Sequence, residues 1–425
     1  MMEIDHVVVL MLENRSFDSM LGLLGGGPSF DGLTGTESNS WSGGTVTVWS
    51  SLHLTPQAIH IPDPDPRESF ADITEQIFGP GQAPPAPATM GGFVANYMKT
   101  PTNDPRAVMH GFAPEQVPVL SALAENFGVS DRWYASAPCQ TWPNRFFAHA
   151  GTAAGYTDNT WRLYEMETIF NRLTEKRRSW RIYHHDAPQS FMLARIWSEL
   201  PEHLYPFEPQ FAADAQAGRL PNYSFIEPRY YPDRLTGRLP NDQHPPHDIT
   251  LGERLIAQVY DAVRSGPGWP RTLLIITHDE HGGIYDHSPP PAALPPDNSR
   301  QQGFAFDRFG VRVPAVIVSP WIPQGSLIRP PEGAAYPFDH TTILATLRRL
   351  FDLEPLTARD AAAPDLLHAL SLPEPSNQGP ASIPMLSASI SRQEMEKALA
   401  APPNALQIGL AEMADHLPSG AAGIP

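Results

Sequence analysis

Long apolar runs with few interruptions are the clearest pattern along this chain. Three of them have the continuous apolar character of strands buried on both faces: Ile4–Leu12, Arg271–Thr277 and Val313–Val318. Gly128–Trp133 and Tyr223–Ile226 are weaker candidates of the same kind. Strands buried on both faces are typical of parallel sheets, so the pattern predicts a parallel sheet at the centre of the fold.

Helical patterns alternate with these strands. Apolar residues recur at helical spacing in Pro114–Phe127, Ile249–Arg264 and Thr341–Phe351, and glycines follow the first two closely. Alternating strands and helices predict an α/β fold, with a mostly parallel sheet covered by helices on both faces. In such sheets, functional groups gather where the carboxyl ends of the strands open.

Composition narrows the class of protein and of partner. The 425 residues include 41% hydrophobic residues and carry a net charge of −17. A phosphate backbone demands a basic surface, so the charge argues against nucleic acid as a partner. A small phosphate ester is not excluded, because one metal ion can reverse the local field of an acidic site. The single cysteine, Cys139, rules out an intramolecular disulfide and a cysteine-based zinc cage.

Segments outside the strands and helices add two expectations. The 48 prolines are roughly twice the usual share and cluster in segments that we interpret as extended loops. No apolar run approaches the ~20 residues that cross a bilayer. The strand-like run begins at Ile4, which leaves no room for a signal peptide ahead of it, so the chain as written is expected to be cytoplasmic. It would be secreted if a signal peptide had been removed. The sequence leaves the oligomeric state open.

Two polar pairs follow two of the predicted central strands. Glu13 and Asn14 come directly after the first strand, and Asp279 and Glu280 come one residue after the strand that ends at Thr277. Three carboxylates brought together would repel one another unless a cation lay between them. Oxygen ligands of this kind suit a hard or borderline divalent ion. The alternative is that each pair caps a following helix, which is less convincing for two pairs on two central strands.

A threonine in a Pro-rich turn is the candidate nucleophile. Thr141 lies just before a helix-like segment, where the helix dipole and a metal would lower the pKa of its hydroxyl. Its alternative role is that of an N-cap. Cys139 is the rival nucleophile, but sulfatase-type enzymes modify a cysteine followed two positions later by proline, and here that position is Thr141. We therefore interpret Cys139 as a packing residue.

Histidines are concentrated in the second half of the chain and interleaved with acidic groups, a pattern that favours ligand or proton-transfer roles. These are His244, His247, His278, His281, His287 and His340. Gly282 and Gly283 would let the backbone approach the site closely. The chain has no G-x-S-x-G elbow, no phosphate-binding P-loop and no H-E-x-x-H zinc helix.

Six blocks of sequence carry a resemblance to a known family. They are VVVLMLENRSFDSMLG, TWPNR, DQHPPHD, THDEHGGIYDHSPPP, GVRVPAVIVSPWI and FDHTTIL. In this order they resemble the bacterial phosphoesterase family of phosphatidylcholine-type phospholipases C and respiratory-burst-inhibiting acid phosphatases, over roughly residues 3–372. That family is similar in fold to alkaline phosphatase, an α/β sandwich around a mostly parallel sheet. We therefore expect a catalytic domain over residues 1–380. The stretch from about Ala381 is rich in Ala and Pro, so 381–425 is expected to be a peripheral segment packed on the domain or trailing from it.

The resemblance also implies roles for individual residues. The implied ligands of one or more divalent ions (Zn, Ca, Mn or Mg) are Glu13, Asn14, Thr141, Asp279 and Glu280. Thr141 would also be the nucleophile, a position where some relatives carry Ser, and His244 would hold the phosphoryl group or assist the leaving group. The remaining implied substrate-binding residues are His184, His185, His247 and Asn144, and the segment YHHD does not distinguish the first two.

The chain departs from the family pattern at one point. Many relatives have a histidine in a D-P-x-H-like context, where this chain reads DPDPRESFAD, with Glu68 or Ser69 near that place. His60 lies several residues earlier. Substrate handling is expected to differ accordingly.

The resulting prediction is a metal-dependent hydrolase of phosphoric esters with a phosphothreonine intermediate, acting on a small phosphate ester or a phospholipid head group. The alternatives are a sulfatase or phosphomutase on the same fold, or a non-catalytic binding protein stabilised by its metal.

Overall fold

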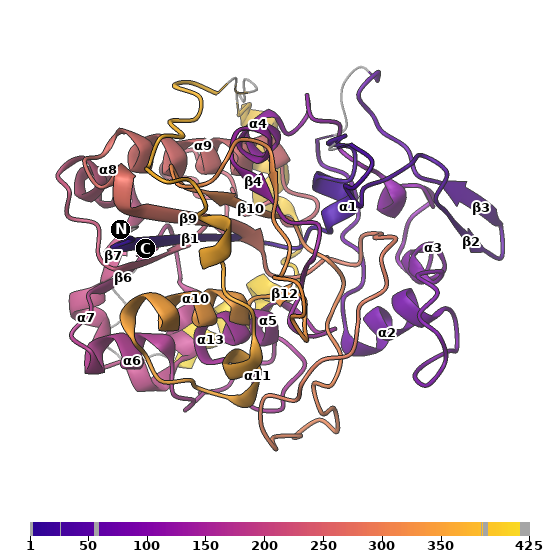
Figure 1. Ribbon diagram of the computed structural model, residues 1–425. Coiled ribbons are helices and arrows are strands. Elements are labelled where there is room, and N and C mark those ends of the chain that lie inside the picture. The colour runs from indigo at the N-terminus through magenta and orange to yellow at the C-terminus, as the bar shows by residue number, and fades with distance from the viewer. Residues whose placement is uncertain (1–2, 26, 55–58, 384, 386–389, 417–425) are drawn as a thin grey trace.

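The computed structural model describes residues 3–25, 27–54, 59–383, 385 and 390–416. Its centre is an eight-stranded sheet (Figure 1). In spatial order the strands are β11 (Ser326–Leu327), β4 (Gly128–Val129), β10 (Ala315–Val318), β9 (Thr272–His278), β1 (His6–Leu12), β8 (Tyr223–Glu227), β6 (Trp180–His184) and β7 (Leu204–Pro206). β10 runs antiparallel to both of its neighbours, and the other pairs are parallel. The prediction of a mostly parallel central sheet is confirmed.

Helices cover both faces of this sheet, as predicted (Figure 1). On one face, Val8, Leu10 and Leu12 of β1 pack into a hydrophobic cluster with three helices. These are α4 (Pro118–Asn126), α8 (Phe207–Gln216) and α9 (Ile249–Ser265). Alternate residues of a strand point to opposite faces, so the neighbouring positions of β1 serve the other layer.

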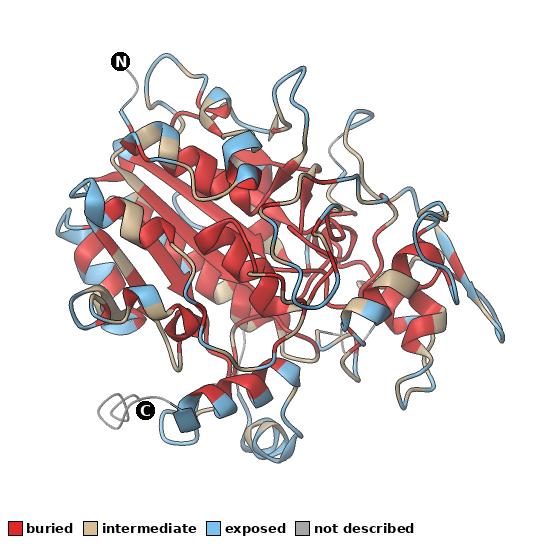
Figure 2. Cartoon of the chain, turned by 90° about the horizontal axis from the view of Figure 1, so that it is seen from below, coloured by how far each residue is buried: buried red, intermediate tan, exposed pale blue. Residues whose placement is uncertain are grey.

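On the second face, Val7, Val9 and Met11 of β1 join another cluster. Its helices are α5 (Thr141–Ala150), α6 (Ile169–Glu175), α10 (Thr341–Phe351) and α13 (Ala405–His416). Figure 2 shows the strands of the sheet buried along most of their length. Burial on both faces is the physical reason why β1 is apolar at every position from Val7 to Leu12.

A smaller unit lies at one end of the sheet (Figure 1). It contains α1 (Phe17–Met20), the hairpin of β2 (Ser38–Trp41) and β3 (Gly44–Thr47), and the helices α2 (Phe70–Phe78) and α3 (Phe93–Tyr97). The hairpin and α2 and α3 share a separate hydrophobic cluster. Ser69 caps α2 by accepting a hydrogen bond from the backbone N–H of Asp72, so the residue before the cap, Glu68, is fixed in place.

Two predicted elements have different bounds in the structure. The expected strand Gly128–Trp133 is divided into β4 and β5 (Trp133–Tyr134), and β5 pairs with β12 (Phe338–Asp339) in a separate ribbon. Asp131 interrupts the strand because its buried carboxylate binds the Arg329 guanidinium. The expected helix Pro114–Phe127 begins only at Pro118, because the side chain of Gln116 accepts a hydrogen bond from the Ala113 N–H and holds a turn there.

The C-terminal segment contributes to the core. Leu406, Leu410 and Met413 of α13 are buried in the cluster beneath α5 and α10, whereas α12 (Arg392–Ala400) has no buried residue. The remaining short helices are α7 (Leu200–His203) and α11 (Ala358–Ala362). The division at residue 380 stays a prediction, and 384, 386–389 and 417–425 lie outside the described residues.

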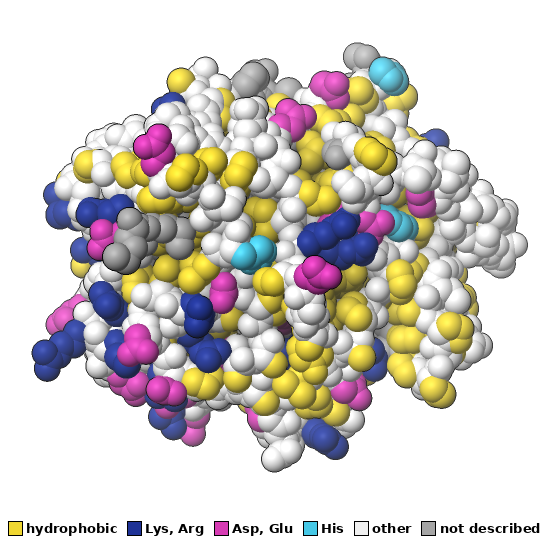
Figure 3. Space-filling view, viewed as in Figure 1, with side chains coloured by type: hydrophobic (Ala, Val, Ile, Leu, Met, Phe, Trp, Pro, Cys, Tyr) yellow, Lys and Arg dark blue, Asp and Glu magenta, His cyan; other side chains and the backbone are white. Residues whose placement is uncertain are grey.

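The surface carries charges of both signs. On the face seen in Figure 3, Lys and Arg side chains stand in small groups among acidic and hydrophobic ones rather than in one continuous basic area. Within the described ranges, no helix has the length and apolar character needed to span a bilayer.

Candidate active site

The two polar pairs predicted from the sequence lie next to each other because β1 and β9 are adjacent parallel strands. Leu12 is in register with His278, so the residues that follow the two strands meet at one edge of the sheet. The Asn14 N–H donates to Asp279 Oδ1 at 2.9 Å. The side chains of Glu13, Asn14, Asp279 and Glu280 are all fully buried. The sheet edge therefore concentrates carboxylates, as the strand pattern predicted.

A left-handed residue and a glycine allow the two loops to approach closely. Asn14 has φ of 47°, a conformation that asparagine tolerates better than most residues. A Cβ on Gly282 would lie 2.6 Å from the Asn14 carbonyl oxygen, and one on Gly283 would lie 2.7 Å from the Arg67 carbonyl oxygen. The expectation that these glycines permit close backbone approach is confirmed.

Thr141 is the first residue of α5 and points at the polar pair after β1. Its hydroxyl lies 3.2 Å from Glu13 Oε2 and 3.4 Å from Asn14 Oδ1. The positive end of the helix dipole and the N–H groups of the first turn favour an anionic oxygen at this position. Thr141 makes no N-cap hydrogen bond, because Gln140 is the N-cap residue. The geometry thus suits a nucleophile better than a cap.

Asn144 holds the turn that presents Thr141. Its side-chain amide accepts a hydrogen bond from the Ala137 N–H at 3.0 Å and donates to the carbonyl oxygens of Cys139 at 2.9 Å and Gln140 at 3.1 Å. These contacts use both ends of the amide, so the structure gives Asn144 a positioning role. Its predicted contact with substrate stays untested.

Cys139, in the same turn, is fully buried, and burial raises the pKa of its thiol. That environment is consistent with packing and opposes a thiolate nucleophile.

Arg145 contacts the predicted site residues, although the sequence reasoning left it unassigned within the TWPNR block. One turn after Thr141 on α5, its buried guanidinium donates to Glu13 Oε1, and its Nε lies 3.8 Å from Asp279 Oδ2. Burial raises the pKa of Glu13 well above its usual range, and the neighbouring Arg145 opposes this rise. The sequence did contain a signal: Arg145 follows the candidate nucleophile Thr141 by four residues, a spacing that places both side chains on one face of a helix.

Glu68 also enters the site. It is 5% exposed, its carboxylate accepts a hydrogen bond from Asn14 Nδ2, and the Gln140 side chain approaches it at 3.4 Å. The segment DPDPRES, where the chain departs from the family pattern, therefore places a carboxylate beside the predicted ligands. Burial raises the pKa of Glu68, and the nearby Glu280 and Asp279 raise it further.

The donor set fits a divalent cation. Asp279 Oδ2 and Glu280 Oε1 are buried and accept no hydrogen bond. Burial raises the pKa of Glu280 well above its usual range, and the nearby Asp279 raises it further. The rise reflects several carboxylates gathered without enough positive charge to balance them. Arg145 balances one of them. Oxygen atoms from carboxylates, an amide and a hydroxyl are ligands that hard divalent ions accept.

His244 lies in the loop that supports Glu13. The Glu13 N–H donates to the Asp242 carbonyl oxygen at 2.8 Å, and His244 Nδ1 lies 2.7 Å from the Pro245 carbonyl oxygen. His244 Nε2 is buried and has no hydrogen-bond partner, while burial lowers the pKa of the ring to about 4. The ring is therefore neutral at pH 7, with a free nitrogen. His247 Nδ1 binds Asp242 Oδ1 at 2.6 Å and thereby steadies the same loop.

His184 and His185, which the sequence did not distinguish, lie at the end of β6 and directly after it. His184 Nδ1 lies 2.8 Å from the Asp186 carbonyl oxygen, and His185 Nδ1 lies 2.9 Å from the Glu227 carbonyl oxygen. His185 Nε2 lies 3.5 Å from Asn241 Nδ2, next to the His244 loop. His185 is the one connected to that loop, but no contact described here joins either ring to Thr141.

Three further buried histidines lie next to Asp279 and Glu280, two of them in sequence and one through a hydrogen bond. His340 Nε2 lies 2.6 Å from the Asp279 carbonyl oxygen, His281 Nε2 lies 2.8 Å from Gln76 Oε1, and His278 Nε2 lies 2.8 Å from Gln243 Oε1. Burial lowers the pKa of all three rings, to about 4 for His340 and about 3 for His281. These hydrogen bonds each use one ring nitrogen, and the expected ligand or proton-transfer roles of the three histidines stay predictions.

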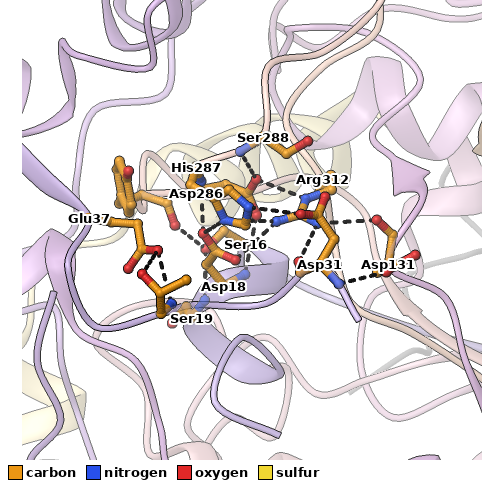
Figure 4. A network of polar contacts seen from close by, with 12 residues as sticks. Ser16, Asp18, Ser19, Asp31, Glu37, Asp131, Asp286, His287, Ser288 and Arg312 are labelled. Atoms are coloured by element: carbon orange, nitrogen blue, oxygen red, sulfur yellow. Dashed lines mark hydrogen bonds and ion pairs between the residues drawn. The ribbon is translucent and has the colours of Figure 1, made fainter. Parts of the chain in front are cut away.

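A separate network ties the two active-site loops together (Figure 4). Asp18, Asp286 and His287 form the group of described residues whose acidic and imidazole ligand atoms lie within 4.8 Å of one another. Arg312 occupies this network, with Nε 2.9 Å from Asp286 Oδ1 and a terminal nitrogen 3.0 Å from Asp18 Oδ1. The guanidinium already supplies the positive charge, so we assign the network a structural role.

Comparisons with known proteins show the family to which the chain belongs. The model of the phosphoesterase family matches residues 4–354. Non-specific phospholipase C1 of Arabidopsis thaliana is 40% identical over 377 residues, covering 85% of this chain and 69% of that protein. Phospholipase C A of Mycobacterium tuberculosis strain H37Rv is 25% identical over 440 residues, covering 88% and 78% respectively.

Solved structures give more distant matches. A protein in the alkaline phosphatase superfamily from Vibrio parahaemolyticus is 11% identical, with a TM-score of 0.40, covering 86% of this chain and 70% of that one. The phosphonate monoester hydrolase of Agrobacterium radiobacter is 10% identical, with a TM-score of 0.36, covering 86% and 77%. Similarity at this level supports no inference about function.

Proposed function

We propose how this chain, which belongs to the phosphoesterase family and is a phosphoric ester hydrolase, carries out its reaction. Thr141 is the proposed nucleophile, and Glu13, Asn14, Thr141, Asp279 and Glu280 are the proposed ligands of a divalent cation. The observation that carries the proposal is the Thr141 hydroxyl at a helix N-terminus, 3.2 Å from a buried carboxylate and 3.4 Å from a buried amide oxygen.

The cation, when bound, supplies Lewis-acid polarisation of a phosphoryl oxygen and lowers the pKa of the Thr141 hydroxyl. Thr141 Oγ1 then attacks phosphorus in line with the leaving oxygen, forming a bond to phosphorus as the ester bond to the alcohol breaks. The alcohol leaves with a proton equivalent to the one that Thr141 lost. Water next attacks phosphorus, its hydroxyl remains on the product, and its other proton restores Thr141.

His244 is the proposed carrier of these protons. The Nδ1 contact with the Pro245 carbonyl oxygen requires a proton on Nδ1, so Nε2 is the acceptor of the neutral ring. A free, buried acceptor can take a proton from the attacking hydroxyl or water and return it to the leaving oxygen. Arg145 orients Glu13 during both steps and favours its ionised form against the effect of burial.

The proposed substrates are phospholipid diesters, of the kind named for the phospholipase C relatives. Cleavage of a diester leaves the head-group phosphate on Thr141, and cleavage of a monoester leaves a simple phosphothreonine. The relevant test compares turnover of p-nitrophenyl phosphorylcholine, p-nitrophenyl phosphate and p-nitrophenyl sulfate after chelation and re-addition of Zn²⁺, Ca²⁺, Mn²⁺ or Mg²⁺. We expect fastest turnover of the choline diester, restored by at least one ion. Faster turnover of the monoester would make this an acid phosphatase, and faster turnover of the sulfate would reject the proposal.

A further inference from the structure

Glu68 lies in a loop outside the central sheet, yet its carboxylate lies beside the proposed ligands. It precedes the N-cap of α2 and is 5% exposed. Asn14 Nδ2 donates to Glu68 Oε2, and Gln140 Nε2 approaches Glu68 Oε1 at 3.4 Å. One of these partners is a proposed ligand, and the other precedes the proposed nucleophile. The Glu68 carboxylate therefore borders the site at the N-terminal end of α2.

The distribution of charge around the site is uneven. At one end, Arg145 pairs with Glu13 and lies 3.8 Å from Asp279. At the other end, the carboxylates of Glu68 and Glu280 are both buried, and Glu68 accepts its hydrogen bonds from amide groups rather than from a cation. One buried oxygen at this end, Glu280 Oε1, has no hydrogen-bond partner. Buried carboxylates are costly unless a positive charge balances them, and a cation bound between them would supply that charge.

We propose that Glu68 is itself a ligand of the divalent cation, so that the site of this chain holds four carboxylates instead of three. This inference rests on the proposed metal site. Its chemical consequence concerns the choice of ion, because every proposed ligand would then offer an oxygen atom and four of them would be carboxylates. Oxygen-only sites favour hard ions such as Ca²⁺, Mn²⁺ and Mg²⁺, whereas imidazole favours Zn²⁺. The proposed site should therefore bind a hard cation in preference to Zn²⁺.

Calorimetric titration of the chelated, full-length protein with Mn²⁺ alone and Zn²⁺ alone tests the proposal without an activity assay. Glu68→Gln keeps the size of the side chain and the acceptor for Asn14 but removes the charge. Asp65→Asn is the matched control: it removes a negative charge from the same loop, one of those acting on Glu280, and Asp65 Oδ1 accepts no hydrogen bond. Circular dichroism of each metal-free variant checks the fold.

We expect Glu68→Gln to weaken Mn²⁺ binding by more than about 100-fold, since loss of an indirect partner of a metal site alone costs about 10–100-fold. Asp65→Asn should change it less than about 3-fold, because a charge that is not a ligand acts only through the screened field. Glu68→His should shift the ratio of affinities towards Zn²⁺. Equal losses in Glu68→Gln and Asp65→Asn would overturn the ligand role of Glu68 and leave the proposed function standing. If the unmodified protein bound neither ion, the proposed metal site itself would fail.

Discussion

Replacing Thr141 with alanine separates the chemical role of the hydroxyl from its contribution to folding. The side chain is fully buried, so the change removes one methyl group and one hydroxyl from the core. The methyl is worth about 1 kcal/mol by area burial. The hydroxyl contacts, at 3.2 Å and 3.4 Å, are at the long end of hydrogen bonding. Together they contribute at most about another 1 kcal/mol. Thr141→Ala should therefore cost about 1–2 kcal/mol of unfolding free energy.

The expected loss of rate is far larger. Removal of a nucleophile that works with a base costs on the order of 10⁶-fold in kcat. That loss corresponds to about 8 kcal/mol of activation free energy. A folding defect of 1–2 kcal/mol cannot reproduce it, because nearly all molecules of a protein with ordinary stability remain folded.

The assay measures kcat on p-nitrophenyl phosphorylcholine for Thr141→Ala and Thr141→Ser, together with urea unfolding of both. The serine variant keeps the hydroxyl and should retain much of the activity. Thr346→Ala is the matched control: Thr346 is equally buried, within α10, and its hydroxyl donates to the Thr342 carbonyl oxygen, so activity should be unchanged. Retention of more than about a hundredth of the wild-type kcat in Thr141→Ala would refute the nucleophile assignment.

Three further predictions follow from neighbouring groups. Asp279→Asn should lose bound metal and activity together in elemental analysis and the same ester assay, and full metal occupancy would argue against Asp279 as a ligand. Arg145→Met should destabilise the chelated protein by about 3–5 kcal/mol in urea unfolding, because it leaves the Glu13 carboxylate buried without its partner. Adding metal should restore part of this unfolding free energy. A loss below about 1 kcal/mol would contradict the prediction. Burial lowers the pKa of His287, but the Asp18 and Asp286 carboxylates outweigh it and raise the pKa to about 9. The ion pair therefore stabilises the fold fully below about pH 6.5 and is lost as the pH rises through about 9, so His287→Gln should remove that slope from the unfolding free energy measured between pH 7 and 10.

The sequence predicted those parts of the site that follow from strand order alone. Glu13 and Asp279 each follow a buried strand, and the carboxyl ends of adjacent parallel strands meet at one edge. The prediction missed β6 and β7, because Arg181 and His184 interrupt the apolar pattern of β6. Arg181 is tolerated there because its guanidinium pairs with Asp214 of α8, a contact that no local pattern encodes.

Residues that reach the site from loops were harder to place. Glu68 arrives through a Pro-rich segment whose path depends on the packing of α2 and α3, so the sequence identified only the departure from a motif. Asn144 was expected to contact substrate, which stays a prediction, and the structure adds hydrogen bonds from its amide to the backbone of the preceding turn. A polar residue near a nucleophile has the same local signature whether it binds a ligand or holds the backbone.

The central claim is that Thr141 carries the phosphoryl group between the two steps. Acid quenching during turnover of p-nitrophenyl phosphorylcholine, followed by peptide mass spectrometry, tests it most directly. A phosphocholine group on the peptide containing Thr141, absent from Thr141→Ala, is the expected result. The same group found on a histidine or on any other residue would contradict the account.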